Sequence, residues 1–495
     1  MHGHEKSDRP VVPANPSNKA GQPAAEAGEG SGLGKENAAS TPRPGPSAGV
    51  SVPSGLDRVR RVARQDKDAR FTALLHHVDV DRLRAAYFAL RPKAAPGVDG
   101  VTWEDYGVDL EENLRDLHAR VHRGAYRARP SRRVFIPKPD GQLRPLGVAS
   151  LEDKILQRAV VEVLNAVYEA DFLGFSYGFR PGRSPHYALD ALAVGIKRKV
   201  SWVLDLDFRD YFSRLDHQWL ERFLEHRIAD QRVLRLIQKW MAAGVVEEGS
   251  WTAFDEGVPQ GASASPLLAN VYAHYVFDLW AHQWRRRHAR GQMVIVRFAD
   301  DAVVGFEYQE DAERFHAELR GRLAKFNLEL AAEKTRLIEF GRFAARDRKR
   351  RGLGKPETFR YLGFTHICAK TRTGRFQLKR ITDSKRIPAK LAVLRGKIER
   401  RQHLPVDEQG RWLASALRGH YQYYAVPDNI EALHAFREQA VRYWFVALRR
   451  RSQRTTVTWE RMGRLADRWL PQPRILHPWP EERFHARTQG RSPVR

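Results

Sequence analysis

Two adjacent acidic residues, Asp300 and Asp301, lie between apolar runs in the stretch VIVRFADDAVVGF at residues 294–306. The apolar flanks predict a β-hairpin whose tip is formed by these two residues. Two-residue hairpin loops favour Asn-Gly, Asp-Gly or Gly-X, and neighbouring carboxylates repel each other. The pair is therefore unfavourable as a simple turn, which points to a positively charged ligand.

A third acid, Asp207, ends the run LDLD, which follows the apolar segment VSWV of a predicted buried strand. Three carboxylates converge if this strand lies beside the hairpin. Two Mg²⁺ ions bound by such a cluster could activate a 3′-hydroxyl and stabilise a leaving pyrophosphate, and they would relieve the repulsion between Asp300 and Asp301. An Asp-Asp pair alone is common in turns. The upstream acid and the basic chain together favour nucleotidyl transfer.

The composition predicts a globular protein with a polyanionic partner. The chain of 495 residues has 85 Lys and Arg against 59 Asp and Glu, a formal charge of +26, with 10% aromatic residues. Its single cysteine, Cys368, excludes a disulfide framework and zinc sites built from cysteine pairs, and it fits a reducing compartment. No apolar run approaches the ~20 residues that cross a bilayer. We therefore expect a cytoplasmic protein with a nucleic-acid partner and no membrane partner.

The order of predicted elements indicates an α+β fold, because strands and helices mix without a βαβ repeat. Residues 1–55 are rich in Pro, Gly, Ala and Ser and are expected to form a disordered tail. Helical periodicity follows over 56–130, and 131–384 combines strands with helices, including a hairpin around Asp-Gly at 140–141. Residues 385–480 are predicted to be helical, and 481–495 a basic tail.

The C-terminal part carries a disproportionate share of the charge. From residue 385 to the end there are 23 Lys and Arg against 10 Asp and Glu, a net charge of +13. Aromatic and basic residues alternate along these helices, which is typical of a nucleic-acid surface, and Arg449, Arg450 and Arg451 are candidate contacts. A merely solvated basic face is the alternative.

Several blocks in a fixed order resemble the reverse transcriptases encoded by group II introns, the intron maturases. They are RRVFIPKPDGQLRPLGV, GFRPGRS, DFRDYFSRLDH, GVPQGASASPLLAN, RFADD, EKTRLIEFG and FRYLGF, and the resemblance covers roughly residues 60–490. It implies a right-hand polymerase, with fingers and a metal-binding palm, followed by a helical thumb or maturase domain. Phe298 replaces the more frequent Tyr before Ala-Asp-Asp.

The resemblance also implies roles for individual residues. Asp207 and Asp300 would bind both Mg²⁺ ions, with Asp301 in support. Phe212 would exclude a ribose 2′-hydroxyl and so favour dNTPs; its alternative is a plain core position. Lys334 could donate a proton to pyrophosphate, or be an exposed lysine at a helix end.

Substrate contacts follow from the same resemblance. Contacts to the incoming dNTP are expected from Lys138, Arg144, Gln260 and Gly261. Template-backbone contacts are expected from Arg180 and Arg183.

The sequence thus predicts an RNA-directed DNA polymerase that copies group II intron RNA from a DNA primer with dNTPs and assists splicing by binding the RNA. Two alternatives stay open. One is an RNA-binding splicing cofactor with a vestigial polymerase site, and the other a domesticated immune or CRISPR-linked polymerase. The sequence does not reveal the cognate intron, the DNA target or the oligomeric state, and no endonuclease with cysteine pairs is recognisable.

Overall fold

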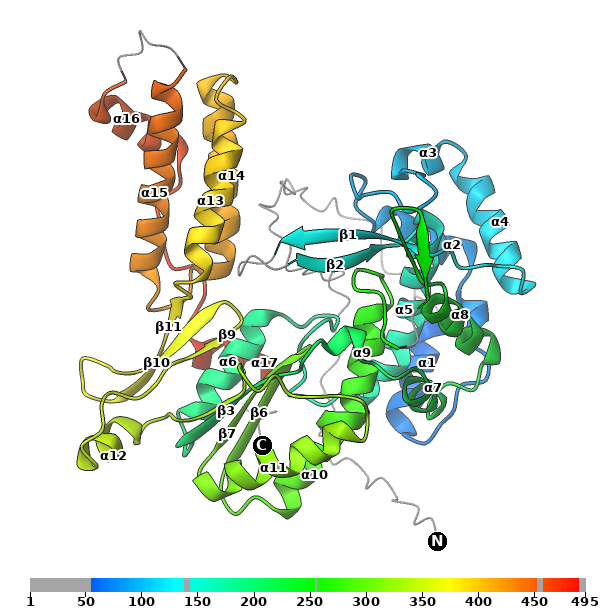
Figure 1. The fold of residues 1–495 in the computed structure, drawn as a ribbon, viewed down its shortest axis with the longest axis horizontal. Helices are drawn as coiled ribbons and strands as arrows, with labels where there is room; N and C mark the ends of the chain where they lie inside the picture. The colour runs from blue at the N-terminus through cyan, green and yellow to red at the C-terminus, as the bar shows by residue number, and fades with distance from the viewer. Residues whose placement is uncertain (1–54, 138–142, 254–255, 452–456, 489–495) are drawn as a thin grey trace, which may run out of the picture.

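The computed structural model describes residues 55–137, 143–253, 256–451 and 457–488, and it confirms a mixed helix and sheet fold (Figure 1). The predicted tail falls outside the described residues except for Gly55, and so does Lys138. No helix in these ranges is long and apolar enough to cross a membrane.

The N-terminal region is helical, as the periodicity predicted. Its helices are α1 (Gly55–Gln65), α2 (Val80–Phe88), α3 (Trp103–Val108) and α4 (Leu110–His122), with a short 3₁₀ turn η1 (Leu75–His77). They pack around α5 (Leu151–Asp171), whose first turn is capped by the Ser150 side chain, which accepts from Asp153 N. The buried apolar face of α5 belongs to the larger of two cores.

An outer sheet follows the N-terminal helices and has the order β2-β1-β4-β5. Its strands are β1 (Ser131–Pro137), β2 (Leu143–Val148), β4 (Val245–Glu247) and β5 (Ser250–Thr252). The first two form the predicted antiparallel hairpin, in which Arg144 lies opposite Ile136. Between β2 and β4 lie β3 and the helices α6 (Pro185–Ile196), α7 (His217–Glu225) and α8 (Gln231–Ala242), with the 3₁₀ turn η2 (Tyr211–Ser213).

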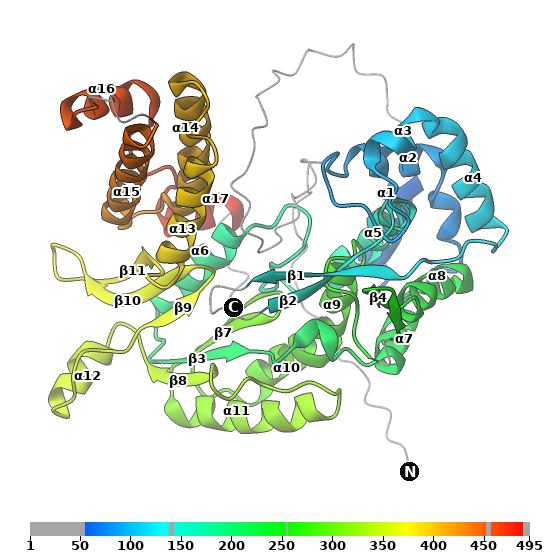
Figure 2. The same cartoon turned by 45° about the horizontal axis from the view of Figure 1, so that its top comes forward.

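The central sheet has the order β6-β7-β3-β8. Its strands are β3 (Trp202–Asp207), β6 (Met293–Phe298), β7 (Asp301–Phe306) and β8 (Arg336–Glu339). Helix α11 (Gln309–Ala324) covers one face and α6 the other (Figures 1 and 2). Alternate strand residues therefore enter different cores, with Leu204 and Val304 on the α11 side and Val203 and Val303 on the α6 side.

The apolar stretch that begins at Ser265 contains a change of helical pitch. It consists of α9 (Ser265–Ala273), a π-helical turn η3 (His274–Asp278) and α10 (Leu279–Arg287). π-helical turns are rare and occur frequently at functional sites. Here the turn places Asp278 under the central sheet, as described below.

A three-stranded sheet joins the central sheet to the C-terminal helices. It is formed by β9 (Phe359–Tyr361), β10 (Phe364–Lys370) and β11 (Phe376–Thr382), and the helix α12 (Ala344–Arg350) precedes it. The block FRYLGF contributes residues to two strands. Leu362 and Gly363 both adopt positive φ, of 47° and 77°, and reverse the chain between β9 and β10.

The C-terminal region is helical, as predicted. Its helices are α13 (Arg386–Glu399), α14 (Val406–Tyr424), α15 (Ile430–Arg449) and α16 (Trp459–Trp469). A further helix, α17 (Pro480–Thr488), begins where only a basic tail was expected, and it packs against α6. The C-terminal helices share the second core with the α6 side of the central sheet.

Candidate active site

The three predicted acids meet at one end of the central sheet. Asp207 of β3 lies opposite Asp301 of β7, and Phe208 N donates a hydrogen bond to Asp300 O over 3.5 Å. Residues opposite each other in an antiparallel pair project from the same face with Cα atoms ~5 Å apart. The predicted convergence of the acidic segments is therefore confirmed, while the metal-binding role of the side chains stays a prediction.

The turn between β6 and β7 differs by one residue from the prediction. Phe298 pairs with Asp301, so that Ala299 and Asp300, rather than Asp300 and Asp301, form the two-residue loop. Ala299 adopts a φ of 58°, and a positive φ at the first loop position is the pattern of a type II′ turn. We call residues 298–301 the acidic turn.

A buried arginine holds the acidic turn. Arg297 Nη1 donates to Ala299 O over 2.8 Å, while Nε and Nη2 donate to the two carboxylate oxygens of Asp278 over 2.7 and 2.6 Å. The same guanidinium also donates to Asn270 Oδ1 and Ser176 Oγ, at 3.2 and 2.8 Å. Burial disfavours its charge, but Asp278 outweighs this effect and raises the pKa of Arg297.

The sequence analysis did not predict this network, although the sequence contains a signal of it. Arg297 interrupts an otherwise apolar strand, and Asp278 interrupts an otherwise apolar helix. Both side chains are fully buried, and a charged side chain is rarely buried unless it is paired. Two opposite charges in two buried elements could therefore have been matched to each other before the fold was known.

The segment containing GFRPGRS lies directly against the acidic turn. A Cβ atom at Gly178 would lie 2.3 Å from Ala299 N, so only glycine allows this approach. Asn270 Nδ2 donates to Gly178 O over 2.7 Å and fixes the loop from the other side. Gly178 therefore allows this loop to pack closely against the acidic turn, which contains Asp300 and Asp301.

Arg180 does not face a template groove, which corrects the sequence-based prediction. Its side chain is only 2% exposed, and its guanidinium donates to both carboxylate oxygens of Glu169 and to the carbonyls of Leu173 and Ser176. These bonds hold the loop to the end of α5. Arg183 is half-buried, donates to Gly174 O over 3.0 Å and lies over the ring of Tyr177.

The residues predicted to contact the nucleotide lie on segments that touch one another. Phe212 stands in η2 and is half-buried, and its carbonyl accepts from Val258 N over 2.8 Å. Gln260 O accepts from Gly147 N of β2 over 2.7 Å. Gly261 has a φ of 104°, and a Cβ there would lie 2.9 Å from Gly147 O. The turn at 259–261 therefore joins η2 to the strand that carries Arg144.

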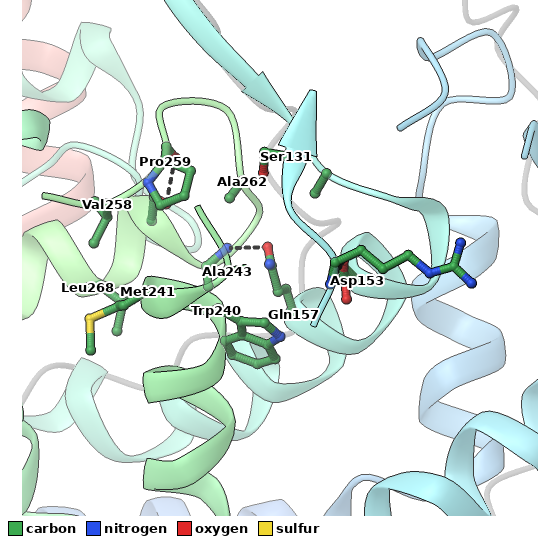
Figure 3. Close-up of a pocket in the computed structure, with 14 residues that line it drawn as sticks. Ser131, Asp153, Gln157, Trp240, Met241, Ala243, Val258, Pro259, Ala262 and Leu268 are labelled. Atoms are coloured by element: carbon green, nitrogen blue, oxygen red, sulfur yellow. Dashed lines mark hydrogen bonds between the residues drawn. The ribbon is translucent and has the colours of Figure 1, made fainter. Parts of the chain in front are cut away.

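A small cavity lies behind this turn, lined by side chains that include Gln157, Trp240, Met241 and Pro259 (Figure 3). Ala264 N donates to Gln157 Oε1 over 3.4 Å at its edge. Its volume of about 20 Å³ is enough for roughly one water molecule. The cavity is therefore too small to hold a nucleotide.

Lys334 contacts the predicted catalytic acids. Its Nζ lies 3.1 Å from Asp207 Oδ2, and the turn that carries it is anchored where Ala331 N donates to Asp207 O over 2.8 Å. Partial burial disfavours the ammonium, but the hydrogen bond and charge of Asp207 outweigh it and raise the pKa of Lys334. Lys334 therefore carries a positive charge beside Asp207 at neutral pH.

The donor chemistry of this end of the sheet fits a divalent cation. Carboxylate oxygens are the ligands that Mg²⁺ prefers, and Asp207, Asp300 and Asp301 supply them from adjacent backbone positions. Within the described residues, no group of three or more His, Cys, Asp or Glu side chains is already gathered closely enough to hold an ion. Suitable ligand atoms thus lie on neighbouring segments at this end of the sheet.

The arginines at the end of α15 lie far from this site. Arg449, Arg450 and Arg451 are exposed at the end of the helical bundle that points away from the central sheet (Figure 1). Arg450 Nη1 lies 3.9 Å from Glu399 Oε1 of α13, and Arg449 lies over the ring of Phe445. They could contact nucleic acid only at a distance from the acidic turn.

Comparison with known proteins identifies the family. Residues 136–366 match the family described as "Reverse transcriptase (RNA-dependent DNA polymerase)". Protein YkfC of Escherichia coli (strain K12) is 35% identical over 289 residues, which cover 51% of this chain and 75% of that protein. The group II intron-encoded protein LtrA of Lactococcus lactis subsp. cremoris is 32% identical over 224 residues, which cover 44% of this chain and 37% of LtrA.

A plant protein extends the same relationship. The mitochondrial nuclear intron maturase 3 of Arabidopsis thaliana is 30% identical over 129 residues, 26% of this chain and 18% of that protein. The family match at residues 136–366 includes the acidic turn and the strand β3 that pairs beside it. The chain belongs to the family of group II intron reverse transcriptases and maturases.

Proposed function

We propose that this chain extends a DNA primer along group II intron RNA at a centre formed by Asp207, Asp300 and Asp301, using dNTPs. The observation that carries the proposal is the pairing of Asp207 with Asp301, which brings the two acidic segments to one end of the central sheet. The fixed acidic turn supports it further, because a preorganised site loses little free energy to rearrangement during reaction.

The arrangement of sheets supports a right-hand polymerase. In this proposal residues 131–384 hold the fingers, represented by the outer sheet, and the palm, represented by the central sheet. Residues 385–480 form the thumb or maturase domain, in which the helices α13–α16 rise beside the central sheet (Figures 1 and 2). In this proposal the template and primer would lie between the outer sheet and the helices α13–α16, over the central sheet.

Two Mg²⁺ ions would activate the primer 3′-hydroxyl and stabilise the leaving pyrophosphate when bound. Asp207 and Asp300 would hold both ions, with Asp301 in support from the same strand end. Lys334, whose ammonium lies beside Asp207, would give a proton to the departing pyrophosphate.

The nucleotide would be bound from both sides of the turn at 259–261. Lys138 and Arg144 would neutralise the triphosphate, while Gln260 and Gly261 would lie against the base. Phe212 would pack under the sugar and exclude a 2′-hydroxyl. Arg183 and the exposed arginines of α15 would contact the RNA backbone, whereas Arg180 holds the loop in place.

A primer-extension assay on an RNA template tests the proposal. We expect Asp207→Ala and Asp300→Asn each to reduce extension at least about 100-fold, because metal-assisted charge stabilisation is worth several kcal/mol. Intron RNA binding, measured by filter retention, should change less than about twofold in the same variants, since affinity depends on phosphate contacts elsewhere.

Asp210→Asn is the matched control. It removes one exposed negative charge three residues after Asp207, and Asn tolerates the left-handed φ of 45° at this position. Extension by this variant should stay near the wild-type rate. Extension at the wild-type rate by Asp207→Ala or Asp300→Asn would refute the assignment of the polymerase centre.

A further inference from the structure

Phe179 stands out at the candidate site because its backbone and side chain are both unusual. It adopts a φ of 55°, in the left-handed region that bulky side chains rarely enter, and its side chain is 38% exposed. Such conformations persist only where the surrounding structure enforces them, and they concentrate at functional sites.

The neighbours of Phe179 enforce this conformation from both sides. Gly178 is pressed against Ala299 of the acidic turn, and Arg180 is buried with its guanidinium bonded to Glu169 and two carbonyls. The residue between these two fixed points has little freedom to choose another backbone conformation. The strain is therefore offset by the contacts that attach the loop to the site.

The ring of Phe179 contacts two aromatic residues of the site. Its centroid lies 6.2 Å from that of Phe212 in an edge-to-face arrangement, and 6.4 Å from that of Phe298, the first residue of the acidic turn. Aromatic pairs favour such geometries at centroid distances of ~4.5–7 Å. Phe212 and Phe298 are half-buried, so Phe179 is the exposed member of this aromatic group.

We propose that Phe179 is a positioning residue for sugar selection: its ring supports Phe212 from the loop side and keeps that ring in the position that excludes a ribose 2′-hydroxyl. The inference rests on the proposed role of Phe212. The Phe212 ring can exclude an rNTP only if it resists displacement. If the ring could rotate away, the clash with the 2′-hydroxyl would be relieved. The strained backbone of Phe179 would thus serve to bring a supporting ring to a place that the loop could not otherwise reach.

Phe179→Gly gives a clean test, because Gly adopts a φ of 55° readily and keeps the loop conformation while removing the ring. The measurement is single-nucleotide primer extension on an RNA template, with kcat/KM determined for a dNTP and for the rNTP of the same base. We expect the preference for dNTP to fall about 3- to 10-fold, the range given by the loss of one aromatic contact. The change should come from faster rNTP use, with the kcat for dNTP nearly unchanged.

Two substitutions separate this inference from the proposed role of Phe212. Phe212→Ala should reduce the dNTP preference more than Phe179→Gly does. The double variant should be no less selective than Phe212→Ala alone, because Phe179 acts through Phe212 and the two effects are not additive. The Phe179→Tyr variant keeps an aromatic ring at this position, so it should retain the wild-type preference for dNTP over rNTP.

The control is Phe88→Ala, which removes an exposed ring from the N-terminal helices, far along the chain from the site. It should leave the dNTP preference unchanged. If Phe212→Ala does not alter the preference, the proposed role of Phe212 fails. If Phe212→Ala alters it and Phe179→Gly does not, or if Phe179→Gly slows dNTP and rNTP use equally, the inference on Phe179 is wrong and the role of Phe212 stands.

Discussion

Two buried ion-pair networks of this protein use the same residue types for different purposes. Under the acidic turn, Arg297 and Asp278 form a pair with one charge of each sign, and both side chains are fully buried. At what we call the C-terminal junction, Asp190 of α6 accepts from Arg380 of β11 over 3.2 Å and also from Arg483 of α17. One carboxylate therefore serves two guanidinium groups.

The electrostatics of the two networks differ accordingly. Asp278 raises the pKa of Arg297 despite complete burial. At the junction, burial lowers the pKa of Arg380, and Asp190 compensates for this only in part while Arg483 adds to the lowering. The first network is balanced and the second has an excess positive charge, which costs free energy in a low-dielectric interior.

The difference indicates what each network is for. The pair under the acidic turn also bonds the backbone of Ala299 and so fixes atoms beside the candidate catalytic acids. At the junction, Asp190 accepts from the side chains of Arg380 and Arg483 and so ties together three elements that are far apart in the sequence. We infer that the first network positions the site, and that the second holds the C-terminal helix against the central part of the protein.

The largest effect is expected from Arg297→Met. It leaves Asp278 buried without its cation, which should lower the free energy of unfolding by about 3–5 kcal/mol. The double variant Arg297→Met/Asp278→Leu replaces the pair by apolar side chains of similar size and should regain most of that stability. Primer extension should stay strongly reduced in both variants, because Ala299 O has lost its donor. Urea unfolding and extension rates measure the two effects.

A wild-type extension rate in the refolded double variant would show that the network under the acidic turn serves stability alone. The two networks would then differ in net charge, but both would serve only to stabilise the fold. If the double variant regains stability but not primer extension, the network positions the acidic turn in addition to stabilising the fold. The single variant cannot separate these two roles, because it loses both stability and the bond to Ala299 O.

The same comparison explains what the sequence could predict. The acids at 207, 300 and 301 each adjoin an apolar run whose period identifies a strand, so their convergence was accessible from local patterns. The hairpin turn was misplaced by one residue because Arg297, through its bond to Ala299 O, stabilises a positive φ at an alanine. That contact depends on the buried guanidinium and has no signature in the turn sequence itself.

The missed features depend on pairs that are distant in the chain. Arg180 resembled a template contact because its motif is basic, yet its partner Glu169 lies on the preceding helix and makes it a buried clamp. The segment that forms α17 was interpreted as a charged tail, because its local sequence does not indicate that Arg483 forms an ion pair with the distant Asp190. Local periodicity predicts elements well, whereas the partners of buried charges follow from the tertiary arrangement.

A smaller effect is expected from Asp190→Asn. It removes the carboxylate that Arg380 and Arg483 share. Because the side chain of Arg380 is only 2% exposed and that of Arg483 16%, the cost should be about 2 kcal/mol. Hydrogen exchange should show faster opening of α17 while the central sheet keeps its protection. Primer extension on a short template should be affected less than in Arg297→Met.

Asp467→Asn is the control for this prediction. Asp467 makes an ion pair with Arg437 at the surface of the same C-terminal region, where such pairs contribute little. Exchange in α17 should stay at the wild-type rate in this variant. Equal exchange rates in Asp190→Asn and Asp467→Asn would remove the basis for assigning an assembly role to the junction.

The smallest effect expected is a pH dependence of the junction. His186 of α6 stacks on His477, bonds to Tyr423 O over 2.8 Å, and lies near Arg380 and Arg483. Burial, helped by the charge on His477, lowers the pKa of His186 to about 3. Well above pH 6.5, His186 is mostly neutral whether the junction is closed or open. As the pH falls below 6.5 the open junction binds a proton that the closed one does not, so closure weakens.

Between pH 7 and pH 6 this linkage should cost the junction about 0.7 kcal/mol, or about a threefold increase in the opening of α17. Hydrogen exchange, corrected for the intrinsic pH dependence of amide exchange, measures it. His186→Gln keeps a donor for Tyr423 O and removes the titrating group, so its opening should rise less steeply; the remaining slope belongs to His477, whose pKa burial also lowers. An identical slope in wild type and His186→Gln would mean that α17 does not sense this histidine. The two networks would then differ in charge balance without any difference in their response to acid.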